Sequence, residues 1–199
     1  MIDEFFLDPH SFIVLEILNA SNQKAIKQKI LFQKISFLSL RVFKQLFELA
    51  DFKAHILGPY SPSLNKTAEQ LIKLGDVQIN ENKELTITDK GIELLEEFHR
   101  TLKTKDERDQ NKEFRNAIEN IKDYFNDFTT DEMLAFIYKS FPNYVEYSIR
   151  KEKLDYIKIF LNLYEKGKLG ISKIAELMGC SYDEAYDLIK KNTKPIMLL

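Results

Sequence analysis

The stretch Gly58-Pro59-Tyr60-Ser61-Pro62-Ser63-Leu64 decides the fold that we predict for this chain. It begins as a tight turn, because proline fixes one turn residue and the glycine before it tolerates unusual backbone angles. Ser61 then supplies an N-cap, and Pro62 a first-turn proline, for a helix that extends through Leu74 and ends at Gly75. The inner face of this helix consists of Leu64, Ala68, Leu71 and Ile72.

The residues that follow this helix predict an antiparallel hairpin. Apolar and polar residues alternate in 77–79 and again in 85–88, on both sides of a polar turn at 80–83. Thr88 can cap the next helix, whose apolar stripe includes Ile92, Leu95 and Phe98. The order helix, hairpin, helix is the outline of a winged helix, so we predict a winged helix-turn-helix in the N-terminal part of the chain.

Two helices and a strand are expected before the turn. Asp8-Pro9 is a helix start, and the short apolar helix that it opens stops at 19–22. A long second helix is expected from near Gln23 to Leu49, because apolar residues recur there at every third or fourth position. Residues 52–57 alternate in part and are expected to form a short strand that leads into the turn.

The second half of the chain is expected to be helical. Residues 101–112 are densely charged and mark the main boundary, and helices are predicted over 114–128 and from Thr129 to a break at Pro142. A further amphipathic helix at 154–164 precedes two short helices that are joined by Gly179-Cys180-Ser181, a helix-turn-helix signature. The prediction is therefore a mainly α protein with a winged-helix domain (1–103), a helical middle region (104–151) and a C-terminal helix-turn-helix segment (152–199).

Composition indicates a globular protein without a membrane span. Hydrophobic residues make up 44% and charged residues 30% of the 199, and no run approaches the roughly 18 apolar residues that a span requires. The first residues are acidic where a secretory signal would be basic. Cys180 is the single cysteine, which is typical of a reducing compartment. We therefore expect a cytoplasmic protein.

The distribution of charge favours a nucleic-acid ligand for the N-terminal part. Residues 21–75 contain nine basic and three acidic side chains, a net charge of +6, although the whole chain has a net charge of −2. A locally basic surface on an acidic protein is what electrostatic docking to phosphate uses. The alternative is that these lysines only cover solvated helix faces.

The predicted helix at 61–74 is the candidate for the major groove of duplex DNA, because its polar side chains can contact base edges and phosphates. The hairpin tip would lie on the adjacent backbone or minor groove. The alternative is that the winged helix is a protein-binding scaffold. The candidate DNA-binding residues are Lys34, Ser61, Ser63, Asn65, Lys66, Thr67, Gln70, Lys73 and Lys83.

The sequence contains no assembled catalytic, metal or cofactor site. His10, His55 and His99 lie in separate predicted elements, and their spacing does not place two on one helical face as a metal pair requires. His99 is expected to be a surface residue near a helix end, and Cys180 a small packing residue. The glycines form no phosphate-binding loop. We therefore expect no enzyme activity, no cofactor and no metal.

The C-terminal helix-turn-helix is a poorer candidate for DNA. Its second helix begins with Asp183, Glu184 and Asp187, which would repel phosphate, so packing or oligomerisation is the favoured role. The apolar tail at 195–199 is expected to dock on another surface.

Residues 29–91 resemble prokaryotic winged-helix proteins of the YwgA-like family, which is related in pattern to the Panacea domain found in antitoxins. The resemblance is carried by Ile30-Leu31-Phe32-Gln33-Lys34-Ile35, by the turn at 58–64 and by Leu85-Thr86-Ile87-Thr88-Asp89-Lys90-Gly91. The helical stretch from Thr130 to Lys151 also looks like the C-terminal helices of that family. Separately, 164–197 is similar to small antitoxin-like helix-turn-helix proteins. These resemblances imply a winged-helix fold and an antitoxin-like role.

Two functional hypotheses follow. The first is a DNA-binding transcriptional regulator or antitoxin-like protein that binds duplex DNA through its winged helix as a homodimer. The second is a protein-interaction module that binds a partner such as a toxin through the aromatic-rich helices between Phe114 and Ile149, without DNA binding.

Overall fold

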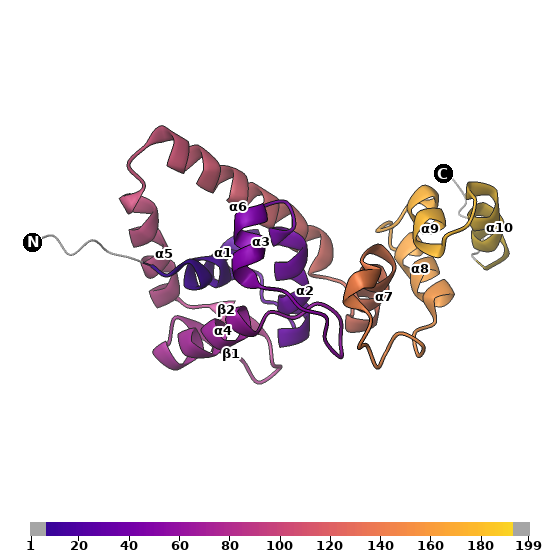
Figure 1. The fold of residues 1–199 in the computed structure, drawn as a ribbon, viewed down its shortest axis with the longest axis horizontal. Coiled ribbons are helices and arrows are strands. Elements are labelled where there is room, and N and C mark those ends of the chain that lie inside the picture. Colours follow the sequence, from indigo (N-terminus) through magenta and orange to yellow (C-terminus); the bar gives the residue numbers. More distant parts are fainter. Residues whose placement is uncertain (1–6, 193–199) are drawn as a thin grey trace, which may run out of the picture. The chain divides into compact units, whose positions relative to one another are not determined.

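The computed structural model describes residues 7–192, and within them the fold is mainly helical with one small antiparallel sheet (Figure 1). This confirms the predicted mainly α class. The chain divides into two compact units, of which the first comprises residues up to 53 together with 59–127. The second comprises 54–58 and the residues from 128 onward. The apolar tail at 195–199 lies outside the described residues.

The first unit is built around helix α1, whose residues 13–18 are all buried. Ile13, Leu15, Ile17 and Leu18 are inaccessible to solvent, and α1 packs against α4, α5, α6 and β2. The elements of this unit are α1 (Pro9–Gln23), α2 (Lys29–Leu40), α3 (Lys44–Ala50), α4 (Pro62–Leu74), β1 (Val77–Ile79), β2 (Leu85–Ile87), α5 (Asp89–Thr101) and α6 (Lys105–Phe125).

The predicted ends of α1 and α4 are confirmed. The Asp8 carboxylate accepts hydrogen bonds from the backbone amides of the first turn of α1, and helical backbone angles stop before Ala20. Ser61 Oγ accepts from the Leu64 amide at 3.1 Å, and Gly75 ends α4 with a φ of +83°. Because glycine has no Cβ, this left-handed angle costs it little.

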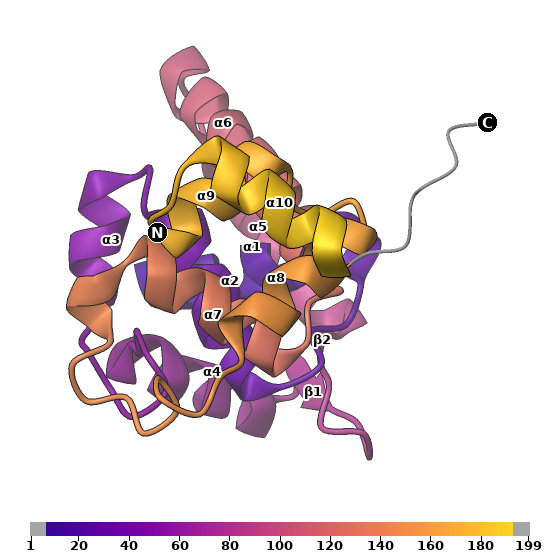
Figure 2. The same cartoon turned by 90° about the vertical axis from the view of Figure 1, so that its right-hand side faces the viewer.

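The predicted hairpin is confirmed, and a third backbone segment pairs with it. β1 and β2 are antiparallel, with Val77 opposite Ile87, and the hairpin turn projects from the helices (Figure 1, Figure 2). Ile26, between α1 and α2, exchanges both backbone hydrogen bonds with Leu85, at 3.0 and 2.9 Å. A Cβ on Gly91 would lie 2.2 Å from the Asp76 carbonyl oxygen, so only glycine fits where α5 leaves the hairpin.

The single long helix predicted from Gln23 to Leu49 is wrong. Helix α2 ends at Leu40, and Phe43, with φ −115° and ψ 87°, starts the separate helix α3. The break turns the chain so that Phe47 packs against Phe37 and Phe52, with ring centroids 5.7 and 5.5 Å apart. The predicted strand at 52–57 is also wrong, because only isolated bridges form there, at Lys53–Tyr60 and Ile56–Gly58.

Helix α6 belongs to the first unit, so the structure divides the chain differently from the predicted boundary at 103. α6 packs along α1 and α2. The Lys122 side chain, which is inaccessible to solvent, donates hydrogen bonds to the carbonyl oxygens of Leu18 and Ala20 at 2.9 and 2.8 Å. These carbonyls lie near the C-terminal end of α1, where backbone carbonyls generally lack partners within a helix.

The second unit is a smaller helical cluster around α7. Thr129 and Glu132 form a capping box at the start of α7, as the sequence predicted for a helix opened by Thr129. α7 packs against both α8 and α9, so no domain boundary falls between the predicted middle and C-terminal segments. Its elements are α7 (Thr130–Ser140), the short 3-10 helix η1 (Pro142–Tyr144), α8 (Tyr156–Glu165), α9 (Ile171–Met178) and α10 (Tyr182–Asn192).

None of the helices within residues 7–192 has the length and apolar character that crossing a membrane requires.

Candidate nucleic-acid interface

The outer face of α4 carries four of the predicted DNA-binding residues. Ser63, Lys66, Gln70 and Lys73 follow one another at three or four residues and therefore lie on one side of the helix. The side chains of the last three are exposed, and that of Ser63 is half-buried. On the opposite side Leu64, Ala68 and Leu71 are buried, and α4 packs against α1. The helix therefore presents a polar surface with two lysines.

An ion-paired network lies beside this surface. The Glu69 carboxylate accepts hydrogen bonds from Lys29 Nζ at 3.0 Å and from Asn65 Nδ2 at 3.1 Å. The hydrogen bond from Lys29, followed by that from Asn65, lowers the pKa of Glu69. The Lys29 and Glu69 charges compensate each other, and the Asn65 amide is already engaged. Asn65 therefore reaches a ligand only by giving up its bond to Glu69.

Lys34 and Ser61 do not belong to this surface. Lys34 lies on helix α2, and only 2% of the residue is exposed. Its Nζ donates to the Pro59 carbonyl oxygen at 2.7 Å. Burial lowers the pKa of Lys34 to about 7. Ser61 is inaccessible to solvent, and its hydroxyl donates to the Ala50 carbonyl oxygen. These two side chains fix the turn at 58–61 instead of facing a ligand.

Thr67 is also buried, on the side of α4 that faces the core. The structure thus removes Lys34, Ser61 and Thr67 from the predicted set, because the fold uses their side chains internally.

The hairpin turn holds Lys83 in solvent. Asn80 fixes this turn, because its Oδ1 accepts from the Glu84 amide at 3.0 Å and its Nδ2 donates to the Glu84 carboxylate at 2.8 Å. Asn82 and Lys83 are exposed at the tip. Lys83 has a φ of +63°, a left-handed conformation that lysine rarely adopts, so the turn determines where its side chain emerges.

Gln33 is a structural residue of the turn that the sequence did not single out. Its Nε2 donates to the Ser61 carbonyl oxygen at 3.2 Å, and its Oε1 accepts from the Ser61 amide at 2.8 Å. Both bonds are buried, so a neighbouring helix specifies the backbone at the start of α4. The available signal was the polar pair Gln33-Lys34 inside the apolar run 30–38, which a solvated helix face does not explain.

The expectation that His99 is an ordinary surface residue is wrong. His99 Nε2 lies 2.7 Å from Oε1 of Glu16, a carboxylate on α1 that is almost completely buried. Arg115 Nε lies 3.7 Å from the other oxygen of the same carboxylate. Burying a carboxylate requires such partners. No pattern in the sequence predicts this cluster, since the three residues come from three separate helices.

Within residues 7–192 no three His, Cys, Asp or Glu side chains come close enough together to hold a metal ion. The acidic start of α10 is exposed, and Glu184 there accepts from the Ser181 amide at 2.8 Å and serves as part of the helix cap.

Comparison with family models, with characterised proteins and with solved structures found no match to this chain. The resemblance to the YwgA-like family therefore stays a prediction.

Proposed function

We propose that the first unit is a winged helix that binds duplex DNA, with α4 in the major groove and the hairpin turn over the neighbouring phosphates. The observation that carries this proposal is the exposed face of Lys66, Gln70 and Lys73 on α4, which leads directly into a projecting hairpin with Lys83 at its tip.

The order of elements supports the winged-helix part. Residue Ile26, between the first two helices, pairs with β2, so the hairpin gains a short third strand segment. A helix, a short strand, further helices and then a hairpin is the arrangement expected of a winged helix. In this arrangement the helix before the hairpin is the one that enters the groove.

The side chains on α4 suit two kinds of DNA contact. Glutamine can form two hydrogen bonds with an adenine edge, which makes Gln70 the candidate for base recognition. Lysine contacts phosphate as a point charge, so Lys66 and Lys73 would fix the position of the helix on the backbone. Glu69 does not oppose the phosphates as a free charge, because Lys29 pairs with it.

The DNA proposal is tested by fluorescence anisotropy with a labelled random duplex at 50 and 200 mM salt. Replacing two phosphate contacts by neutral residues in Lys66→Gln/Lys73→Gln should lower the salt slope by about 1.8. Wild-type affinity should then fall about 12-fold more than that of the variant over this salt range. The matched control is Lys151→Gln/Lys153→Gln, which removes two exposed lysines of the second unit. Absence of binding at 50 mM salt, or equal slopes for all three proteins, would refute the proposal.

In this proposal the protein is a non-enzymatic transcriptional regulator or antitoxin-like protein and acts as a homodimer. A dimer would bind two half-sites about one helical turn apart, because its symmetry is matched by the operator. Light scattering gives the oligomeric state. Anisotropy with duplexes of 12 and 26 base pairs tests the geometry, since only the longer duplex accommodates both half-sites.

A second candidate function is protein binding by the second unit. The Ile149 amide donates to the Ile56 carbonyl oxygen at 3.1 Å, so these two residues are neighbours. Yet the exposed fractions are 46% for Ile56, 60% for Tyr147 and 59% for Ile149. Clustered exposed apolar side chains mark interaction sites more often than isolated ones do. We name Ile56, Tyr147 and Ile149 the apolar patch.

The apolar patch is tested with the variant Ile149→Asp and the control Tyr186→Asp, which changes an exposed tyrosine on α10. A partner recovered by affinity purification is repurified, and its affinity is measured with both variants. Loss of binding in Ile149→Asp alone, with DNA affinity unchanged, supports this function. Equal binding by both variants excludes the patch.

A further inference from the structure

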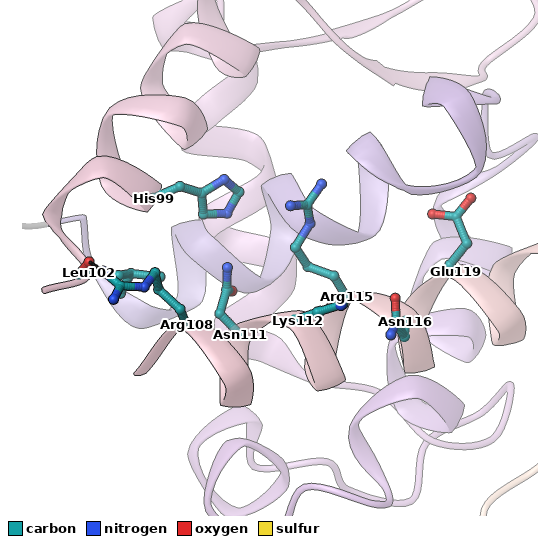
Figure 3. Close-up of a pocket in the computed structure, with 8 residues that line it drawn as sticks. All are labelled: His99, Leu102, Arg108, Asn111, Lys112, Arg115, Asn116 and Glu119. Carbon is teal, nitrogen blue, oxygen red and sulfur yellow. Dashed lines mark hydrogen bonds between the residues drawn. The ribbon is translucent and has the colours of Figure 1, made fainter. Parts of the chain in front are cut away.

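A polar hollow of about 510 Å³ lies between α5 and α6 in the first unit. His99 from α5 and Asn111 and Arg115 from α6 point into this space (Figure 3). Arg108, Lys112 and Glu119 of α6 also line it. The hollow therefore brings together three basic side chains and one carboxylate, all from α6, beside His99 of α5.

An apolar hollow of similar volume, about 510 Å³, is formed by α1, α3, α5 and α6. Its walls are aromatic: the ring of Phe12 lies 4.8 Å from that of Phe98 and 5.5 Å from that of Phe114, and Phe43 packs edge-on against Phe114 at 5.1 Å. Phe12, Phe43 and Phe98 are only half-buried, so their rings remain partly accessible.

The two hollows adjoin, because Leu102 and Asn111 line both of them. At this junction the Asn111 Oδ1 atom is buried and has no hydrogen-bond partner among the described residues.

We propose that the two adjoining hollows form one binding site for a small amphipathic carboxylic acid, with an aryl or medium-chain alkyl body among the phenylalanines and its carboxylate beside Lys112. The proposal concerns a small molecule and does not depend on DNA binding by the first unit.

The charges in the polar hollow favour a single negative charge. Arg108 already donates to the carbonyl oxygens of Leu102 and Lys103 at 3.2 and 3.0 Å, and Arg115 faces the buried Glu16. Glu119 accepts from the Ser21 amide at 3.0 Å. Among residues 7–192 the exposed Lys112 side chain has neither a hydrogen-bond nor an ionic partner. Lys112 is therefore the basic side chain of this hollow that is available to a monoanionic carboxylate.

The rim of the apolar hollow sets the orientation of the ligand. Glu107 and Glu113 line this hollow, against the single cation Lys44. Their negative charge would repel a carboxylate placed on the aromatic side. The acid group therefore lies at the α5–α6 side and the apolar body at the phenylalanine side, where burial of each CH₂ group favours binding.

The test is isothermal titration of the full-length protein with 4-phenylbutyrate and with its neutral amide. We expect the acid to bind at least fivefold more tightly than the amide, since a charge-assisted bond at a partly exposed site is worth about 1 kcal/mol. Lys112→Gln should weaken acid binding about fivefold and leave amide binding unchanged. The control Lys105→Gln, on the same helix but outside both hollows, should bind like wild type.

A mapping experiment locates the bound acid. Amide chemical shifts of a nitrogen-15-labelled protein should move around Leu102 and Asn111 when 4-phenylbutyrate is added. Far-UV circular dichroism confirms that each variant is folded. The proposal is overturned if the acid does not bind at millimolar concentration, if acid and amide bind equally, or if the shifts that move lie outside the two hollows.

Discussion

Replacing Lys34 by methionine should remove a pH dependence from the stability of the first unit. Methionine keeps most of the side-chain volume but cannot be protonated. The Lys34 amine is buried in the fold with one acceptor, the Pro59 carbonyl oxygen at 2.7 Å. Its pKa of about 7 in the fold lies far below the value of 10.5 for an exposed lysine.

The sign of the effect follows from proton binding. Between pH 7 and 10.5 the unfolded chain holds a proton on Lys34 that the folded chain has released, so the free energy of unfolding rises with pH. Below pH 7 both states are protonated, and the cost of the buried charge is present in full. For these two pKa values, the contribution of Lys34 to stability increases by about 2 kcal/mol from pH 7 to pH 9. Because Lys34 is almost fully buried, solvent does not screen this effect.

The assay is urea unfolding followed by circular dichroism at several pH values between 7 and 9. The free energy of unfolding of the wild type minus that of Lys34→Met should rise by about 2 kcal/mol over this range. The control Lys66→Met removes an exposed lysine of α4, and its curve should run parallel to that of the wild type. A constant difference between wild type and Lys34→Met would refute the reasoning, because it would mean that the buried amine keeps its proton throughout.

Three further substitutions test contacts within each of the two units. Gly91→Ala should destabilise the first unit by about 1–3 kcal/mol in urea unfolding, because its Cβ would meet the Asp76 carbonyl oxygen at 2.2 Å. Lys122→Met should cost about 1–3 kcal/mol at pH 9, since it leaves the carbonyl oxygens of Leu18 and Ala20 without their donor; an unchanged urea midpoint would show that water replaces it. Thr129→Ala removes the cap of α7 and should cost about 1 kcal/mol, seen as roughly fivefold faster hydrogen exchange in α7 if that helix opens locally, while exchange in α1 stays unchanged.

Local signals in the sequence predicted the ends of helices and the hairpin correctly. Ser61-Pro62, Gly75 and Thr129 act through hydrogen bonds or backbone angles within four residues, so their effect is readable without the rest of the fold. The same holds for the exposed face of α4, which follows from helical spacing alone.

Contacts between distant residues decided what the sequence did not reveal. The apolar spacing continues from α2 into α3, yet aromatic packing of Phe47 against Phe37 and Phe52 favours a break at 41–43. Lys34 has the composition of a surface residue, and only the turn at 58–61 provides the carbonyl oxygen that makes its burial acceptable. Three of the nine predicted DNA-binding residues, Lys34, Ser61 and Thr67, are buried, and for Lys34 and Ser61 such contacts are the reason.

The candidate small-molecule site could also not be predicted from the sequence. Three of the phenylalanines of the apolar hollow come from α1, α5 and α6, and Phe43 comes from the break before α3. The spacing within these segments does not show that some of the rings remain partly accessible. Likewise the charged run at 101–112 looked like a solvated linker, because its spacing does not show that Arg108 and Lys112 line a hollow between α5 and α6.

The bonds from Lys122 to the end of α1 have a consequence for synthesis of the protein. They join residues 104 and 102 positions apart, and α1 is made first. At a translation rate of about 5–20 residues per second, Lys122 is synthesised roughly 5–20 seconds after the end of α1 to which it donates its hydrogen bonds. During that interval the apolar residues of α1 have no α6 to cover them. We therefore expect nascent chains halted before residue 122 to engage chaperones, and chains halted well beyond residue 127 to be released from them.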